Sequence, residues 1–273
     1  VRYGAKFSID LYQFDGKVTR IANVPLPRPT IIHDFIVTAR HAIFFCAPVR
    51  LRLARLLAGI GSFDSNLVWE PEHGTEIVVI PLADPSRPLR FTVDPFFQWH
   101  FVNAWEEGTT LVADHIPYDD WETNHWFGRA PYEPARMPPR SRYARARIDL
   151  AAKRMSVDVL SDVSMEFPAI HRDDAGREHE HAWVLDMSAG LPPSLCRFDT
   201  RTRTLHRVPL GEGAFPGEAV VVPEGWVLSL VYDGGRDASY VAVIDGARPE
   251  AGPVARLWFD HAIPFLFHGV WAP

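Results

Sequence analysis

The sequence predicts an all-β fold, and a β-propeller is the architecture that it favours. About sixteen short runs of alternating or β-branched residues follow one another at the spacing typical of all-β folds. The chain contains 24 prolines and 18 glycines, which end strands and form turns. Long runs of helix-forming residues are scarce. So many successive hairpins favour a propeller over a sandwich, although no repeated blade signature is present.

The predicted strands are distributed over the whole chain. A hairpin is expected where two alternating runs meet at Asp15-Gly16, a dipeptide typical of tight turns. A second pair of strands brackets Ala39-Arg40. The predicted strands cover residues 6–12, 17–23, 31–38, 41–47, 76–80, 89–93, 98–104, 109–115, 143–150, 181–185, 194–199, 205–208, 218–222, 226–232, 240–244 and 254–259.

Two segments do not have a strand pattern. Residues 49–61 mix leucine and arginine at helical spacing and end at glycine, which predicts a short amphipathic helix or an ordered loop over the core. The alternative is a basic and apolar patch that rests on a membrane face. Residues 116–139 have no period and predict a long irregular insertion. No domain boundary is evident, so residues 1–273 are expected to form one domain.

Charge and cysteine content exclude some classes of protein. The net charge is −6 and no basic block is present, which argues against a nucleic-acid partner. Cys46 and Cys196 lie far apart in apolar runs and are expected to be reduced core thiols, as in a cytoplasmic protein. No signal peptide or membrane span is visible. The chain begins with Val1 and enters a strand at once, so a fragment of a longer protein is expected.

Three histidines share one kind of environment. His33, His100 and His268 each lie alone within an aromatic or aliphatic run. Neutral imidazole is a common ligand of divalent metals, and a propeller sends a strand of every blade past one central axis. Histidines from different blades can therefore converge, although spacing does not identify which of the three do so. The alternative for each is a hydrogen-bonded histidine of the core.

Two glutamates also stand out. Glu166 and Glu218 are flanked by apolar residues, where a carboxylate is costly to bury unless it is paired. A metal-bound imidazole usually donates its second N–H to such an acceptor. Each glutamate taken alone is expected at a turn or a strand edge. Taken with the histidines, they complete a metal site in which carboxylates orient the ligands.

At these residues the chain resembles the carotenoid cleavage oxygenases. The motifs that carry the resemblance are His-Asp-Phe at residues 33–35, His-x-x-Asn-Ala-Trp-Glu at 100–106, Glu-Phe-Pro at 166–168, Gly-Glu at 217–218 and Phe-His-Gly at 267–269. They occur in the order of the family, and the resemblance extends from about residue 3 to residue 271.

The resemblance implies a seven-bladed β-propeller with Fe(II) held on its axis by four histidines. By this similarity His33 matches the third ligand and His268 the fourth, while Glu166 and Glu218 match two carboxylates that orient ligands. His100 belongs to a family motif whose histidine is not counted among the ligands, so it is an outside candidate near the site. The first two ligands and the first glutamate of the family precede His-Asp-Phe. No His or Glu precedes His33 here, so these residues are expected upstream of residue 1, and the chain matches the C-terminal part of the family.

The function implied by the resemblance is oxidative cleavage of a carbon–carbon double bond by O₂. The substrate would be a carotenoid, an apocarotenoid or a stilbene-like molecule. The protein is expected to be cytoplasmic and to contact a membrane peripherally. Candidates for an aromatic tunnel are Phe96, Phe97, Trp126, Phe127 and Phe265.

Two other classes of protein are alternatives. One is a non-catalytic binding propeller whose metal site is incomplete. The other is a hydrolase that uses paired carboxylates for acid–base chemistry. The adjacent pairs are Glu106-Glu107, Asp119-Asp120 and Asp173-Asp174.

Overall fold

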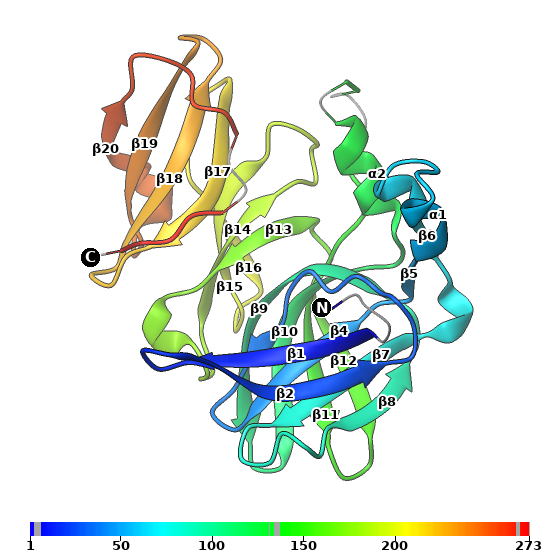
Figure 1. The fold of residues 1–273 in the computed structure, drawn as a ribbon. Helices are drawn as coiled ribbons and strands as arrows, with labels where there is room; N and C mark the ends of the chain where they lie inside the picture. The colour runs from blue at the N-terminus through cyan, green and yellow to red at the C-terminus, as the bar shows by residue number, and fades with distance from the viewer. Residues whose placement is uncertain (3–6, 131, 134–136, 266–267, 273) are drawn as a thin grey trace.

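The computed structural model describes residues 1–2, 7–130, 132–133, 137–265 and 268–272. Within these residues twenty strands form four four-stranded sheets and two two-stranded sheets (Figure 1). The predicted all-β class is therefore confirmed. Tyr3, where the family resemblance begins, and Phe267, of the Phe-His-Gly motif, lie outside the described residues.

Each four-stranded sheet is an antiparallel blade. In the first blade, the strand order is β3 (Ile36–Val37), β4 (His41–Cys46), β7 (Thr75–Pro81) and β8 (Leu89–Val93). The second contains β9 (Phe97–Glu107), β10 (Thr110–Tyr118), β11 (Tyr143–Asp149) and β12 (Arg154–Ser161). The third contains β13 (Met165–Ala169), β14 (His181–Asp186), β15 (Ser194–Asp199) and β16 (Thr204–Arg207). The fourth contains β17 (Ala214–Val221), β18 (Trp226–Asp233), β19 (Ala238–Asp245) and β20 (Pro253–Trp258).

The remaining elements are short. The hairpin predicted at Asp15-Gly16 is present, and Gly16 adopts a φ of 76° in its turn. The two-stranded sheets pair β1 (Phe7–Phe14) with β2 (Val18–Leu26), and β5 (Val49–Leu51) with β6 (Leu67–Trp69). The helices are α1 (Leu53–Leu57), α2 (Glu122–Arg129) and four 3₁₀ turns, η1 (Asp64–Asn66), η2 (Pro71–His73), η3 (Arg172–Asp174) and η4 (Pro249–Ala251).

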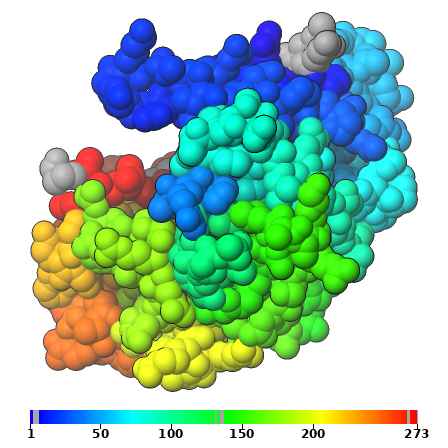
Figure 2. Space-filling model, turned by 90° about the horizontal axis from the view of Figure 1, so that it is seen from below, coloured from blue at the N-terminus to red at the C-terminus, as the bar shows by residue number. Residues whose placement is uncertain are grey.

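The blades pack face to face and follow one another in chain order. Ile43 and Ile77 of the first blade lie in one buried cluster with Leu111 of the second, and Leu195 of the third packs in another cluster with Val231 of the fourth. Burying an aliphatic side chain of this size stabilises the fold by about 1.5–3 kcal/mol. The first strands of successive blades also contact one another, β3 with β9, β9 with β13, and β13 with β17. Figure 2 shows the chain running around the molecule in this order, with the β1–β2 hairpin (blue) standing apart from the fourth blade (orange to red).

The first strands of three blades share one irregularity. In each, two residues stand opposite a single residue of the neighbouring strand, which is a β-bulge. In β9, Trp99 and His100 stand opposite Ile116 of β10. In β13, Phe167 and Pro168 stand opposite Val184 of β14. In β17, Gly217 and Glu218 stand opposite Leu230 of β18. Bulges redirect side chains, and here they occur where the first strands of the blades meet.

Some elements differ from the sequence-based expectations. The segment 116–139 is not wholly irregular, because β10 continues to Tyr118 and helix α2 follows. Strands β12 and β13 were not predicted, so Glu166 lies inside a strand that the pattern missed. The helical interpretation of residues 49–61 is confirmed only for α1, since residues 49–51 form β5.

Cys46 and Cys196 are both free and buried, as expected. Within the described part of the chain, none of the helices is both long enough and apolar enough to cross a bilayer.

Candidate metal centre

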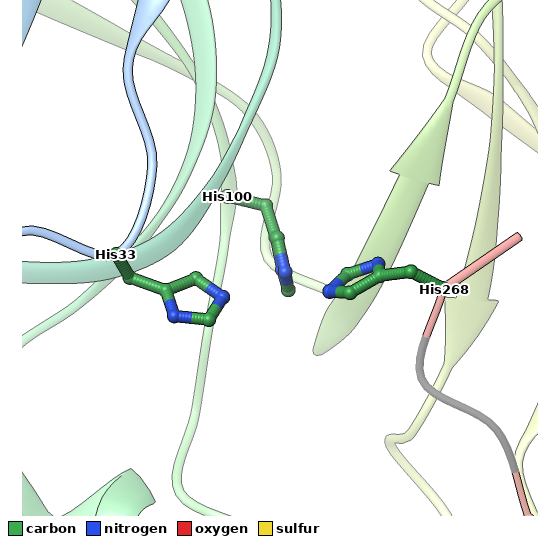
Figure 3. Close-up of side chains that lie close together, drawn as sticks. All are labelled: His33, His100 and His268. Carbon is green, nitrogen blue, oxygen red and sulfur yellow. The ribbon is translucent and has the colours of Figure 1, made fainter. Parts of the chain in front are cut away.

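Three imidazoles from three separate segments converge where the first strands of the blades meet. His33 precedes β3, His100 lies in β9 and His268 follows β20. Their ligand nitrogens all lie within 4.8 Å of one another. The ring centroids are 5.2 Å apart for His33 and His100, 5.1 Å for His100 and His268, and 6.4 Å for His33 and His268. Figure 3 shows the three rings facing a common space.

The structure thus brings together the two histidines that the resemblance selected. It differs from the sequence-based expectation for His100, which lies inside the cluster and not beside it. The apolar pattern alone had grouped all three histidines. His100 was set aside because the motif comparison did not count it as a ligand, and the bulge in β9 is what turns it toward the other two.

Glu166 holds His100 firmly. One carboxylate oxygen, Oε2, lies 2.6 Å from His100 Nδ1 and also accepts the backbone N–H of Phe167 at 2.8 Å. The other oxygen, Oε1, accepts the hydroxyl of Tyr118 at 3.0 Å. With Nδ1 engaged by Glu166, His100 presents Nε2, which is buried and has no hydrogen-bond partner among the described residues. An orphaned buried nitrogen of this kind fits a metal ligand.

Glu218 stands in the same relation to His268, but more loosely. Its two oxygens lie 3.4 and 3.3 Å from His268 Nδ1, and Oε2 also accepts the backbone N–H of Gly269 at 3.1 Å. The pairing expected for Glu166 and Glu218 is therefore present in the geometry, with one glutamate behind each of two histidines.

Asp34 joins the segment of His33 to the strand of His100. Its carboxylate accepts the backbone N–H of Phe101 at 2.8 Å through Oδ2 and that of Phe35 at 2.7 Å through Oδ1. This contact fixes the residue after His33 against the residue after His100. The aspartate of the His-Asp-Phe motif therefore sets the distance between two histidines of the cluster.

The electrostatics follow from burial and from the carboxylates. Burial lowers the pKa of His33, and the neighbouring His100 and His268 lower it further. Burial also opposes the charged form of His100, but the Glu166 carboxylate outweighs it and raises the pKa of His100. Burial raises the pKa of Glu218.

The rest of the His-x-x-Asn-Ala-Trp-Glu motif holds β9 in place. Asn103 donates through Nδ2 to the carbonyls of Asp174 and Arg177, which ties the β13–β14 connection to β9. Glu106 accepts hydrogen bonds from Thr38 and Arg40. Burial opposes the charge of Glu106, but these bonds outweigh it and lower its pKa to about 2. These residues are structural supports for the strand that carries His100.

One pocket contains the three histidines, and a second shares part of its wall. The first, called here the histidine pocket, has a volume of about 320 Å³ and is lined by Trp99, Asn124, Phe127, Glu166 and Phe167 beside the three histidines. The second, called the apolar pocket, has a volume of about 470 Å³, and its walls include Trp126, Leu185, Met187, Leu191, Phe215 and Phe265. Phe127 and Phe167 line both pockets.

The aromatic tunnel candidates divide accordingly. Trp126, Phe127 and Phe265 line pockets, whereas Phe96 packs against Phe45 and His115, and Phe97 packs against Trp99 and Trp121. Sequence reasoning missed Trp99, Tyr118 and Phe167. Trp99 and Phe167 could have been found by their position directly beside His100 and Glu166.

The adjacent carboxylate pairs have structural partners away from the histidine pocket. Glu107 and Asp119 pair with Arg147 and Arg142, respectively. Asp120 accepts the backbone N–H of Glu122. Among the described residues, Glu166 is the one acidic side chain that lines the histidine pocket, and it is engaged by His100. This arrangement does not supply the paired carboxylates that a hydrolase needs.

A second group of potential ligands lies on the surface. It consists of Glu70, Glu72 and His73, of which the last two are exposed. Arg50 binds Glu70 through Nε at 2.8 Å, so this carboxylate is already neutralised. The group has no buried, unpartnered atom that would indicate a ligand.

Comparisons with known proteins agree with the geometry. The family model of the retinal pigment epithelial membrane protein matches residues 1–273. The chain is 26% identical to the apocarotenoid-15,15'-oxygenase of Synechocystis sp., over 94% of this chain and 55% of that protein. It is also 26% identical to the isoeugenol monooxygenase of Pseudomonas putida, over 98% of this chain and 59% of that protein. The chain thus spans little more than half the length of these relatives.

The fold is also similar to that of cobalt-substituted Synechocystis ACO. The TM-score is 0.88 at 24% identity, and the match covers 99% of this chain and 59% of that one. This match confirms the predicted propeller architecture. The count of seven blades stays an implication of the resemblance, since the described residues form four blades and the two-stranded sheets β1–β2 and β5–β6.

Proposed function

Because the chain belongs to the family of the retinal pigment epithelial membrane protein, we propose that it forms part of an Fe(II)-dependent oxygenase that cleaves a carbon–carbon double bond with O₂. His33, His100 and His268 would hold the metal. The observation that carries this proposal is the convergence of three imidazoles around the orphaned, buried Nε2 of His100.

The residues present fit a divalent iron. Imidazole nitrogen is a good ligand for Fe(II), and the carboxylates of Glu166 and Glu218 orient two of the rings. Ligand bonds of about 2.1 Å place nitrogens at most about 4 Å apart, close to the spacing of this cluster. With His100 counted, three histidines of this chain would hold the metal, one more than the two that the resemblance alone selected. Bound Fe(II) would supply the centre for O₂ activation, and one double bond plus one O₂ gives two carbonyl products.

The protein's own side chains would bind and orient the substrate. Trp99, Phe127 and Phe167 line the histidine pocket with aromatic surface, which favours a flat, apolar molecule. Glu166 is the one carboxylate among the described residues that line this pocket, and it is occupied by His100, so the pocket offers no free carboxylate for acid–base chemistry. This suits a reaction that adds oxygen to a double bond without proton transfer by the protein.

The names of the relatives support an apolar, unsaturated substrate. One relative is named for an apocarotenoid and another for isoeugenol, and a third, from Crocus sativus, is named a zeaxanthin cleavage dioxygenase. We propose a carotenoid, an apocarotenoid or a stilbene-like molecule as the substrate class.

Chelation and restoration of the metal test the proposal. The protein is stripped of metal, then supplied with Fe(II) under nitrogen and exposed to air with a coloured polyene aldehyde. We expect bleaching and two carbonyl products after Fe(II) is restored and none before. Alanine at His33, His100 or His268 should abolish bleaching, whereas His261→Ala, a change at an exposed histidine, should not.

The alternatives predict different outcomes. A non-catalytic binding propeller would hold no stoichiometric Fe(II) and would bind the polyene without cleaving it. Activity that survives chelation would contradict the iron-dependent proposal.

A peripheral membrane contact is proposed at the segment of α1 and η1. Leu57, Ile60 and Phe63 are exposed there, Leu57 by 79%, and Arg52 and Arg55 flank them. Apolar side chains beside arginine suit the interfacial zone of a bilayer.

The same segment lies beside the site. Asn124, which lines the histidine pocket, hydrogen-bonds Asp64 of η1. We expect the protein to co-sediment with anionic liposomes and the triple variant L57S/I60S/F63S to remain in the supernatant. Equal sedimentation of both proteins would contradict the contact. A cytoplasmic location remains an expectation.

A further inference from the structure

Phe167 stands at the border of the two pockets. It lines both the histidine pocket and the apolar pocket, and so does Phe127 of helix α2. The two rings lie edge to face with centroids 6.4 Å apart. A molecule that reached from the histidines into the apolar pocket would therefore lie against both rings.

The position of the Phe167 ring is set by an unusual backbone. Its φ is 53°, in the left-handed region that bulky residues rarely adopt, and it lies in the β13 bulge. Its N–H donates to Glu166 Oε2, the same oxygen that contacts His100 Nδ1. A costly conformation of this kind persists where the surroundings impose it, and such positions cluster at functional sites.

The ring is also fixed against the histidines. Its centroid lies 5.4 Å from that of His100 and 6.0 Å from that of His268, and the side chain is 5% exposed. Phe167 is therefore tied to the metal cluster on one side and forms the wall of the apolar pocket on the other. Phe127 comes from a different element, helix α2, and contributes the second ring of the border.

We propose that Phe127 and Phe167 form a sieve that admits the slim, open-chain part of a polyene to the apolar pocket and excludes a ring-bearing end. This would determine which double bond lies beside the histidines, because the substrate can advance only until its ring meets the two phenylalanines. The inference rests on the proposed function for the kind of substrate. It adds that Phe127 and Phe167 select the shape of the substrate and determine how far it advances past the histidines.

Binding to metal-free protein tests the sieve without any cleavage. Two polyene aldehydes of equal conjugated length are used, one with an open-chain end and one that ends in a substituted cyclohexene ring. Trp99 and Trp126 line the two pockets, so quenching of tryptophan fluorescence reports binding. We expect the natural sequence to prefer the open-chain aldehyde by about tenfold or more, as for other shape-selecting apolar pockets.

Changes on both sides of the border should remove this preference. Phe127→Ala leaves β13 unaltered, and Phe167→Gly opens the same border while suiting the positive φ. Each should reduce the preference to less than about threefold, mainly by tighter binding of the ring-bearing aldehyde. Phe14→Ala, at an exposed position of the β1–β2 hairpin outside both pockets, serves as the matched control and should leave the preference unchanged.

The outcomes separate this inference from the proposed function. An unchanged preference in Phe127→Ala overturns the sieve, even if Fe(II) restores cleavage. A lost preference in both variants supports the sieve, even if no cleavage is found with iron. Failure of the natural sequence to discriminate between the aldehydes overturns it directly. With iron restored, the two variants should also give products cut at more than one double bond.

Discussion

The two histidine–glutamate pairs of the site have the same chemistry but different surroundings. His100 and Glu166 are 13% and 1% exposed, and their contact measures 2.6 Å. His268 and Glu218 are 52% and 13% exposed, and the corresponding contact measures 3.3 Å. Both glutamates lie at bulges in the first strand of a blade, so a backbone bulge is common to both pairs.

The difference lies in the number of groups that hold each carboxylate. Glu166 receives the Tyr118 hydroxyl and the Phe167 N–H in addition to His100, whereas Glu218 receives the Gly269 N–H from the segment of His268 itself. The first pair is therefore fixed by two blades before a metal binds. The second pair depends on a segment that follows the last strand. A buried carboxylate that accepts several hydrogen bonds is already fixed in place. It should therefore orient its histidine for the metal at a lower entropic cost.

The comparison predicts that Glu166→Gln has the largest effect on metal binding. Glutamine keeps the shape but removes the charge that His100 contacts. Loss of a partner of this kind weakens metal binding by about 10–100-fold, and we expect the upper end for Glu166. The dissociation constant for Fe(II), measured without oxygen against a competing chelator, checks this. A loss smaller than that for Glu218→Gln would reverse the ranking of the pairs.

A buried histidine outside the metal cluster should make the fold sensitive to acid. His179, between the second and third blades, is buried, and burial together with Arg145 lowers its pKa to about 4 from 6.5. The histidine is held at Nδ1 by Asn103, at 3.2 Å, and at Nε2 by Tyr143, at 3.0 Å. Asp114 lies 3.5 Å from Nε2, and burial raises its pKa.

The sign of the pH effect follows from these pKa values. Below pH 6.5 the unfolded chain binds a proton at His179 and the folded chain does not, until pH falls to about 4. Stability should therefore fall as the pH falls through this window, by about 2 kcal/mol at pH 5. Urea unfolding at pH 7 and pH 5 measures the loss. His179→Gln should lose less stability between the two pH values.

Glu218→Gln should have a smaller effect than Glu166→Gln. The contact it alters is longer and more exposed, so we expect Fe(II) binding to weaken by about tenfold. Glu224→Gln, an exposed change in the β17–β18 turn, is the matched control and should leave binding unaltered. A loss of about 100-fold for Glu218→Gln would show that the solvent-facing pair contributes as much as the buried one.

The contrast between the pairs was largely invisible in the sequence. Alternating runs predicted most strands and placed His33 and His268 in apolar contexts, and the motif order indicated the family. The bulges were not predictable, because a two-to-one pairing depends on the partner strand and not on local composition. His100 was set aside because the motif comparison did not count it as a ligand, although its apolar run had grouped it with His33 and His268. Strand β13 was missed because Glu166 and Pro168 interrupt its apolar pattern.

Helix α2 illustrates another limit. Only Thr123 and Trp126 of its eight residues are buried, so the apolar repeat that marks a helix is absent. Its placement over the histidine pocket follows from packing, since Trp99 Nε1 donates to Thr123 at 3.1 Å. Tyr118 was hidden in the same segment, where β10 extends beyond the run that predicted it.

Tyr118→Phe should have the smallest effect and is the most specific probe of the buried pair. It removes one hydroxyl donor and leaves Glu166 Oε1 without that hydrogen bond, while Oε2 keeps His100 and Phe167. We expect a loss of about 1–2 kcal/mol in the free energy of unfolding, and Fe(II) binding about threefold weaker. Tyr12→Phe, at an exposed position, controls for the change of residue type. Lower stability with unchanged Fe(II) affinity would mean that the other contacts of Glu166 suffice to orient His100, and that the number of donors is not what distinguishes the two pairs.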